Sequence, residues 1–165
     1  MKRIVLLLLV AASMGGLTLS AQTVNSLENG KYSLSVGDVT LTVDASRGGK
    51  IVSYKYKDTE ILSQTRMPNS FGSTFWTSPQ SEWNWPPVPE YDTKPFNAEV
   101  TDGKLVLTGE KSKRFGYKVR KEFVADTKDN AIVITYTLVN ESGETRKVAP
   151  WEISRVPNGG ILFFD

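Results

Sequence analysis

The chain has 165 residues, with 20 Lys or Arg against 18 Asp or Glu, and it contains neither cysteine nor histidine. The absence of both residue types excludes disulfides, thiol nucleophiles, Ser-His-Asp catalysis and zinc sites built from histidine or cysteine. Any acid–base chemistry must therefore use Asp, Glu, Lys or Tyr.

The first 21 residues have the pattern of a secretory signal peptide. Lys2 and Arg3 form a positive start, residues 4–10 are continuously apolar, and small residues precede Ala21. The apolar run is too short for a stable membrane span, although an uncleaved anchor is the alternative. We expect residues 1–21 to be removed and the mature chain to be exported to the periplasm or the extracellular space, with no membrane partner.

Removal of this segment also changes the charge balance. Loss of Lys2 and Arg3 lowers the 20 basic residues to 18, equal to the 18 acidic ones. A chain without net positive charge has little electrostatic attraction for phosphate, so we expect no nucleic-acid partner. A neutral surface is compatible with glycans, although neutrality does not select them.

Residues 22–165 are predicted to form one all-β domain. Apolar and polar residues alternate in short segments, with Tyr32, Leu34 and Val36 on one face of the first segment, and turn signals such as Gly37 separate the segments. We expect strands at residues 31–36, 39–43, 50–56, 59–62, 96–100, 104–109, 116–124, 131–139 and 145–156. Many short strands with regular turns are typical of a sandwich or barrel, and no long helix is expected.

Residues 63–95 interrupt this pattern. Six of the eight prolines fall here, together with Trp76, Trp83 and Trp85. Such a density of proline predicts an irregular segment rather than a helix or a central strand, and irregular segments of this length are usually functional. We expect the three indoles to lie on a surface loop.

Indoles on a loop, mixed with amides and carboxylates, are typical of sugar recognition. The C–H face of a pyranose stacks on an aromatic ring, and its hydroxyls need hydrogen bonds. Gln80 and Glu82 are the expected hydrogen-bonding partners beside Trp76, Trp83 and Trp85. The alternative is that the loop folds over one sheet and the indoles pack against the core, since tryptophan is usually highly buried.

A second group of candidate ligand contacts lies in the segment 145–156. Alternation places Trp151 and Arg155 on one face and Glu152 on the other, unless Pro150 introduces a bulge. We consider Trp151, Glu152 and Arg155 as ligand contacts, since arginine can hold an acidic sugar through two hydrogen bonds. The alternative is that Trp151 is a core residue and Arg155 pairs with a surface carboxylate.

Catalysis on a sugar would have to use carboxylates. Glycoside hydrolysis needs two of them, roughly 5–9 Å apart. Glu82 and Glu152 are the candidate catalytic residues, and Glu90 and Asp92 are further candidates by location. Spacing along the sequence does not show whether any two lie together, and neither a metal site nor a cofactor is expected.

Basic residues are frequent between Lys111 and Lys121. This run is a potential anion site, but Glu110 and Glu122 interrupt it. A solvated sheet face is therefore the expected arrangement.

Two stretches carry a resemblance to a known family. Residues 75–87 (FWTSPQSEWNWPP) and 149–156 (APWEISRV) resemble an uncharacterised group of exported bacterial proteins in the galactose-mutarotase-like superfamily, and residues 48–62 and 132–140 are similar to the same superfamily. The resemblance covers most of residues 28–165. It implies an antiparallel β-supersandwich that binds hexoses in an open groove on one sheet.

The resemblance also sets expectations about completeness and chemistry. Superfamily members are typically nearly twice as long, and the apolar segment 161–165 ends abruptly, so we expect the domain at 22–165 to be truncated at its C-terminus. Mutarotases of this superfamily use two histidines and a late glutamate. This chain has no histidine, and Trp151, Glu152 and Arg155 occupy the neighbourhood of the acid, so the resemblance implies sugar binding rather than mutarotase chemistry.

We therefore expect an exported carbohydrate-binding domain whose partner is a mono- or oligosaccharide. The first alternative is a sugar-active enzyme of aldose epimerase, glycoside hydrolase or lyase type that uses carboxylates. The second is a protein-interaction or adhesion module, because aromatic side chains also anchor protein interfaces.

Overall fold

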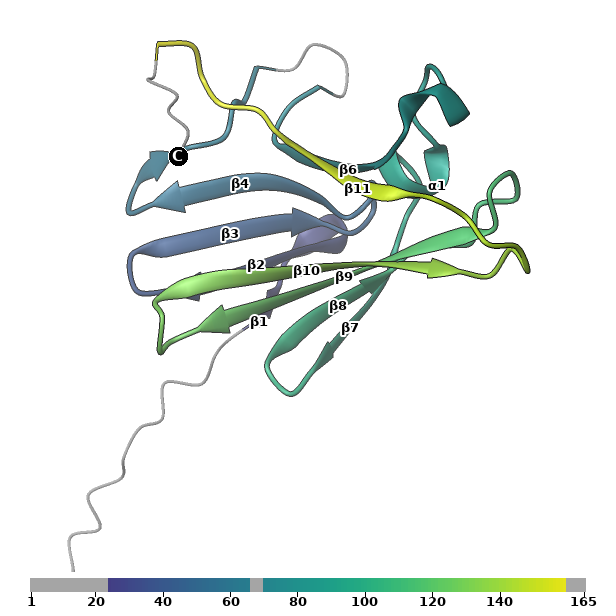
Figure 1. Cartoon of the computed structure of the whole chain (residues 1–165). Helices are drawn as coiled ribbons and strands as arrows, with labels where there is room; N and C mark the ends of the chain where they lie inside the picture. The colour runs from purple at the N-terminus through teal and green to yellow at the C-terminus, as the bar shows by residue number, and fades with distance from the viewer. Residues whose placement is uncertain (1–23, 66–69, 160–165) are drawn as a thin grey trace, which may run out of the picture.

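The protein forms two antiparallel β-sheets that pack against each other as a sandwich (Figure 1). The computed structural model describes residues 24–65 and 70–159. The first sheet has the strand order β1-β2-β3-β4-β6-β11, with β5 paired to β4, and the second has the order β10-β9-β8-β7. The all-β sandwich expected from the alternating segments is confirmed.

Most strands lie where the alternation predicts them. The strands of the first sheet are β1 (Val24–Ser26), β2 (Lys31–Val36), β3 (Val39–Asp44), β4 (Lys50–Tyr56), β5 (Thr59–Glu60), β6 (Ser73–Ser78) and β11 (Ala149–Ser154). Those of the second sheet are β7 (Asn97–Thr101), β8 (Lys104–Thr108), β9 (Tyr117–Asp126) and β10 (Ala131–Asn140). The described part of the chain also has three short helical turns, η1 (Glu28–Gly30), η2 (Gln80–Glu82) and α1 (Pro89–Asp92).

The turns follow from the residues that occupy them. Asp102 and Gly103 join β7 to β8 with φ angles of 49° and 73°, the two positive values that a tight hairpin turn of this hand requires. Gly37, with φ 51°, lies in the turn between β2 and β3. Glycine takes such angles without the steric cost that a Cβ would bring.

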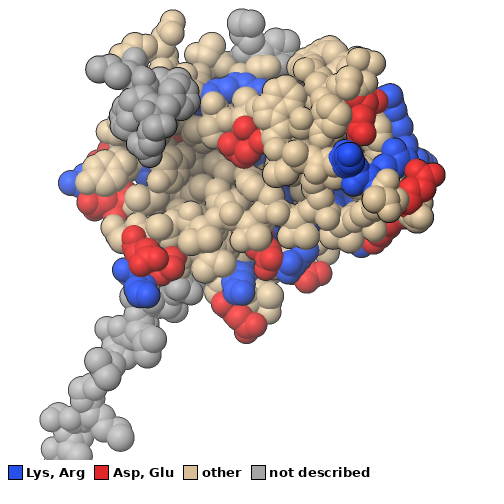
Figure 2. All heavy atoms as spheres, viewed as in Figure 1, with Lys and Arg blue, Asp and Glu red and all other residues tan. Residues whose placement is uncertain are grey.

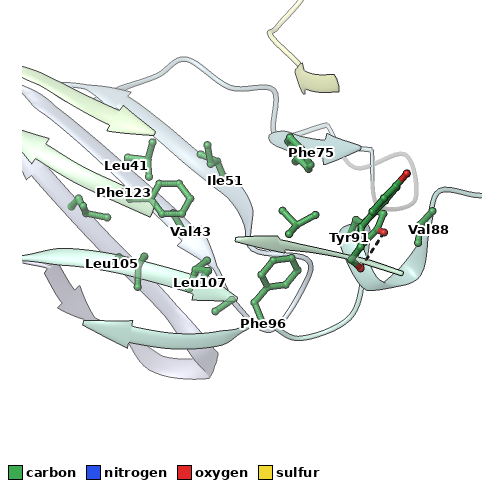
Figure 3. Packing of buried hydrophobic residues seen from close by; sticks show 14 of the residues in the cluster. Leu41, Val43, Ile51, Phe75, Val88, Tyr91, Phe96, Leu105, Leu107 and Phe123 are labelled. Atoms are coloured by element: carbon green, nitrogen blue, oxygen red, sulfur yellow. Dashed lines mark hydrogen bonds between the residues drawn. The ribbon is translucent and has the colours of Figure 1, made fainter. Parts of the chain in front are cut away.

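The core lies between the sheets and follows the period of two along each strand. In β9, every second residue from Tyr117 to Ala125 is buried and the residues between them are partly exposed. Side chains from both sheets converge in Figure 3. The buried residues that the strands contribute include Leu34, Leu41, Val43 and Ile51 from the first sheet and Leu105, Leu107, Val119 and Phe123 from the second.

One expectation about the proline-rich segment is wrong. Within residues 63–95, β6 is a regular strand inside the first sheet, between β4 and β11, so Trp76 lies on a strand and not on a loop. Residues 73–78 (STFWTS) contain no proline and are rich in aromatic and β-branched residues, which favour strands. The prolines flank this strand in the sequence, and the described residues on both sides of it, 63–65, 70–72 and 79–95, are irregular apart from the short helical turns.

Pro150 lies at an edge of the first sheet. Pro150 lies in β11, which is the last strand of that sheet, where a missing N–H is tolerated. The segment predicted to direct export (1–21) and the apolar segment 161–165 lie outside the described residues. Across the described ranges, no helix has the length and apolar character needed to cross a bilayer.

A charged side chain lies inside this core. Lys121 on β9 is only 1% exposed, which shows that the basic run is not solvated at this position. Its Nζ donates hydrogen bonds to the carbonyl oxygens of Gly48 (2.7 Å) and Gly49 (3.2 Å). The ammonium also lies 5.1 Å from the ring centroid of Phe96 and 5.8 Å from that of Tyr136, within cation–π range. Carbonyl dipoles and aromatic faces replace its lost hydration.

Burial lowers the pKa of Lys121 to about 7, while Asp92 and Glu152 oppose this shift and Lys50 adds to it. The ordinary pKa is 10.5, so the unfolded chain binds more protons than the folded chain between these two values. The free energy of unfolding therefore rises with pH above about pH 7, and the cost of burying the charge is fully present below it.

We predict that Lys121→Met removes this pH dependence. Between pH 7 and pH 9.5, the wild-type free energy of unfolding should rise relative to that of the variant by up to about 1.4 kcal/mol per pH unit. Urea unfolding followed by circular dichroism at several pH values measures the difference. Lys104→Met, on the exposed side of β8, is the matched control and should keep the wild-type slope. Parallel pH profiles for wild type and Lys121→Met would contradict the prediction.

Candidate functional site

The pairing of β6 with β11 sorts the candidate residues onto two faces. Trp76 lies opposite Trp151, and Phe75 lies opposite Glu152. Phe75 is buried and stacks on Tyr136 of β10, with ring centroids 4.7 Å apart, so its face of the pair points toward the second sheet. The indoles of Trp76 and Trp151 therefore point the other way. The parity predicted for the segment 145–156 is confirmed.

All four tryptophans of the chain meet around Trp76. Its ring centroid lies 5.6 Å from that of Trp151, 5.8 Å from that of Trp83 and 5.8 Å from that of Trp85. The three interplanar angles are 87°, 69° and 83°, the edge-to-face geometry that the aromatic quadrupole favours. Trp76 is thus the centre of the cluster.

The four indoles differ in exposure. Trp83 is 4% exposed, and its Nε1–H donates to the carbonyl oxygen of Thr77 at 2.9 Å. Trp85 is 67% exposed and has the highest exposure among the large hydrophobic side chains of the described residues. The cluster therefore contains a buried member that supports it and an exposed member that offers a face to solvent.

Trp76 and Trp85 line a pocket of about 350 Å³. Asp92 and Arg155 are the charged residues in its wall. Asp92 accepts a hydrogen bond from Trp76 Nε1–H at 2.8 Å, and the Arg155 guanidinium lies 5.8 Å from the centroid of the Trp76 ring. The remaining lining residues are Ser70, Pro86, Pro87, Pro89 and Thr93. The pocket thus combines two indoles with one carboxylate and one guanidinium.

A short helical turn positions the carboxylate. Asp92 is the last residue of α1, which begins with Pro89 at its first position, where a missing N–H costs nothing. Tyr91 of the same turn is 1% exposed, and its hydroxyl donates to the carbonyl oxygen of Tyr117 at 3.3 Å. Burial raises the pKa of Tyr91, so this hydroxyl stays protonated as a donor. Tyr91 therefore anchors α1 in the core while Asp92 faces the pocket.

Backbone and side-chain hydrogen bonds hold Arg155. Its N–H donates to the carbonyl oxygen of Gly72 at 3.1 Å, and its carbonyl oxygen accepts from Ser63 N–H at 2.7 Å. Its Nη1 donates to the hydroxyl of Thr74 at 3.3 Å. Among the described residues, no carboxylate lies within ion-pair distance of Arg155, so the surface ion pair considered for it does not form there.

Three sequence candidates lie away from this pocket. Gln80 and Glu82 are on η2, where the Gln80 side chain donates to Asn84 O and the Glu82 backbone carbonyl accepts from Arg114. Neither lines the pocket. Glu152 lies on the opposite face of β11 and accepts a hydrogen bond from Ser73 Oγ. The structure therefore brings Trp76, Trp85 and Arg155 together, with Trp83 and Trp151 as neighbours of Trp76.

The two candidate catalytic carboxylates do not meet in any of the hollows described for residues 24–65 and 70–159. Glu152 lines a hollow between the sheets, of about 350 Å³, whose walls are mostly apolar and include Ile51, Ile134 and Tyr136. Figure 2 shows this hollow as a depression with tan walls and an acidic group at its upper edge. Glu82 does not reach it, so the structure does not pair these carboxylates. The described residues also contain no group of three or more acidic side chains that could hold a metal ion.

Sequence reasoning weighed Asp92 only as one carboxylate among several, and it missed the hydrogen bond that joins this residue to Trp76. The signal that could have found it is Pro89 three positions earlier, because a proline followed by acidic residues marks the start of a helical turn. The prolines of the pocket wall, Pro86 and Pro87, contributed to the sequence analysis only as a sign of an irregular segment. Contacts between Trp76 and residue 92 span sixteen positions and leave no local pattern.

Comparison with known proteins adds no assignment: no protein-family model, curated protein or solved structure matches the chain. The chemistry of the site must therefore be argued from its own geometry.

We predict that Trp76→Phe destabilises the protein. Phenylalanine keeps an aromatic ring but removes the N–H that bonds the Asp92 carboxylate, and a hydrogen bond to a charged group contributes about 1.5–3 kcal/mol. Urea unfolding followed by circular dichroism should show a loss of that order. The matched control is Trp85→Phe, whose exposed indole makes no hydrogen bond within the described structure, and it should change stability by less than about 0.5 kcal/mol. Equal stability of the two variants would argue against the Trp76–Asp92 bond.

Proposed function

We propose that the pocket between Trp76, Trp85, Asp92 and Arg155 binds a carbohydrate. The observation that carries this proposal is the exposed indole of Trp85, which is held edge-on against Trp76 beside a carboxylate and a guanidinium. A sugar ring has an apolar C–H face for the indole and hydroxyls for the charged groups.

The polar groups of the pocket have complementary roles. Trp76 is the only described residue that hydrogen-bonds the Asp92 side chain, and it engages Oδ1. The second carboxylate oxygen can accept from a sugar hydroxyl. Arg155 can donate to hydroxyl or ring oxygens, since a guanidinium has five N–H groups and only one bond, to Thr74, is formed here. Acceptor and donor thus flank the aromatic face.

Binding is favoured over glycoside hydrolysis by the number of carboxylates. Asp92 is the only acidic residue among the described residues that line this pocket, whereas hydrolysis with an acid and a base or nucleophile needs two. The proposed role is therefore recognition.

We also propose export to the periplasm or the extracellular space, where the domain would meet glycans. The support for export is the signal-peptide pattern of residues 1–21.

We further propose that the sandwich is of the galactose-mutarotase-like type. The support is that the two stretches carrying the resemblance, 75–87 and 149–156, include the larger part of β6 and all of its neighbour β11, and line the same pocket through Trp76 and Arg155. In that superfamily, sugars are expected on one sheet of the sandwich, and this pocket lies on the first sheet and its following segment.

A protein interface is the second candidate function. Trp85, Trp151 and Val156 are 67%, 36% and 62% exposed, and exposed aromatic side chains are frequent anchors of protein interfaces. A protein partner that remains bound in excess free oligosaccharide would favour this alternative, because the proposed sugar would compete for Trp85.

We predict that a bound oligosaccharide changes the tryptophan emission and that Trp85→Ala weakens its binding by about 5- to 30-fold, corresponding to about 1–2 kcal/mol of lost stacking. A panel of neutral and acidic oligosaccharides, titrated by fluorescence and by calorimetry, measures both effects. The matched control is Tyr56→Ala, because Tyr56 is also an exposed aromatic residue (52%) but lies on β4 and outside the pocket. Absence of heat and of emission change across the whole panel would sink the proposal.

A further inference from the structure

We propose that the ligand is an anionic oligosaccharide of at least two units, which lies across Trp85 and fills two adjoining hollows. This inference rests on the proposed sugar-binding function and adds the length and charge of the ligand. Three features carry it: a second hollow that shares a wall with the pocket, the basic residues at both hollows, and the ion pair that already occupies the nearest acid.

The second hollow adjoins the first through the same segment. Trp85, Pro86, Pro87 and Pro89 line both hollows, and each hollow has a volume of about 350 Å³. This size lies at the lower end of small-molecule pockets. A disaccharide can therefore place one sugar ring in each hollow, with Trp85 between the two rings. A monosaccharide would leave one hollow empty.

The charge at the second hollow is positive. Lys113 and Arg114 line it, and Lys113 forms no ion pair with another described residue. Arg114 donates to a neutral group, the backbone carbonyl of Glu82, at 2.6 Å, and its guanidinium lies 4.9 Å from the ring centroid of Phe115. Arg114 is therefore held in place while its charge remains without a carboxylate partner.

The acid of the second hollow already has a cationic partner, which it shares with a second carboxylate. Glu90 accepts from Lys94 Nζ at 3.0 Å, and Lys94 also pairs with Glu110. In the first hollow, Asp92 faces Arg155 and binds Trp76.

Across both hollows, three cationic side chains without a carboxylate partner (Lys113, Arg114 and Arg155) outnumber the two acids in the walls, Asp92 and Glu90. Carboxylate or sulfate groups on the sugar would compensate this excess, because charge-assisted hydrogen bonds to arginine and lysine are the strong ones.

The two chemical sources of the negative charge can be separated with matched ligands. Tetragalacturonate is compared with its neutral methyl ester, and a sulfated galactan tetrasaccharide is compared with its desulfated form. Calorimetry should show at least one charged ligand binding about tenfold more tightly than its neutral counterpart, the effect of one charge-assisted hydrogen bond. The preference should fall with added salt, and the corresponding charged monosaccharide should bind more weakly than the tetrasaccharide.

Variants test the residues behind this preference. Lys113→Met should weaken binding of the preferred charged ligand about 3- to 10-fold and leave its neutral counterpart unchanged. Lys128→Met is the control, since it removes an exposed lysine from the turn between β9 and β10, outside both hollows.

The outcomes separate the two proposals. Equal affinity for charged and neutral ligands overturns this inference but leaves sugar binding intact, and equal affinity for monosaccharide and tetrasaccharide overturns the use of two hollows. Binding of none of the four ligands, with no response in the wider glycan panel, removes the proposed function and this inference with it.

Discussion

The hydrogen bonds donated by Lys121 Nζ are the interaction on which the arrangement of the two sheets depends. It extends from β9 in the second sheet to the carbonyls of Gly48 and Gly49, in the turn that joins β3 to β4 of the first. A buried charge is tolerated only when its donors are satisfied, so this side chain defines how closely the turn approaches β9. Hydrophobic contacts alone are less directional and would permit the sheets to slide.

The same turn connects the core to the pocket. Gly48 has φ 63°, its N–H donates to Lys94 O at 2.8 Å, and a Cβ at this position would lie 2.2 Å from the carbonyl oxygen of Asp92. Only glycine permits the close approach of this turn to the end of α1. The position of Asp92, and through it the hydrogen bond to Trp76, therefore follows from contacts that begin at the buried Lys121.

The strands could be predicted from the sequence because alternation is a local signal, and most boundaries agree within one or two residues. β6 was missed since the prolines around it dominate the composition of residues 63–95, although its own six residues contain none. Lys121 was misjudged for a similar reason. Lys121 lies on the same face of β9 as Tyr117, Val119 and Phe123, which indicates that it points inward. Fully buried lysines are rare, however, so the sequence analysis predicted a solvated side chain. The grouping of Trp85, Asp92 and Arg155 depends on tertiary contacts that no local pattern records.

Apart from Trp76 on β6, the pocket is lined by residues outside the strands, including Arg155 directly after the edge strand β11, and such segments are usually the mobile parts of a sandwich. Here, however, each contributing residue is attached to a buried or partly buried part of the fold. Trp85 packs on Trp76, Asp92 is carried by a turn whose Tyr91 is in the core, and the backbone of Arg155 is bonded on both sides to Gly72 and Ser63. A site organised before the ligand arrives loses less conformational entropy on binding. A sugar hydroxyl that binds the protein gives up hydrogen bonds to water, so the net free energy gained is small. Binding of a sugar therefore depends more on such preorganisation than binding of an apolar ligand does.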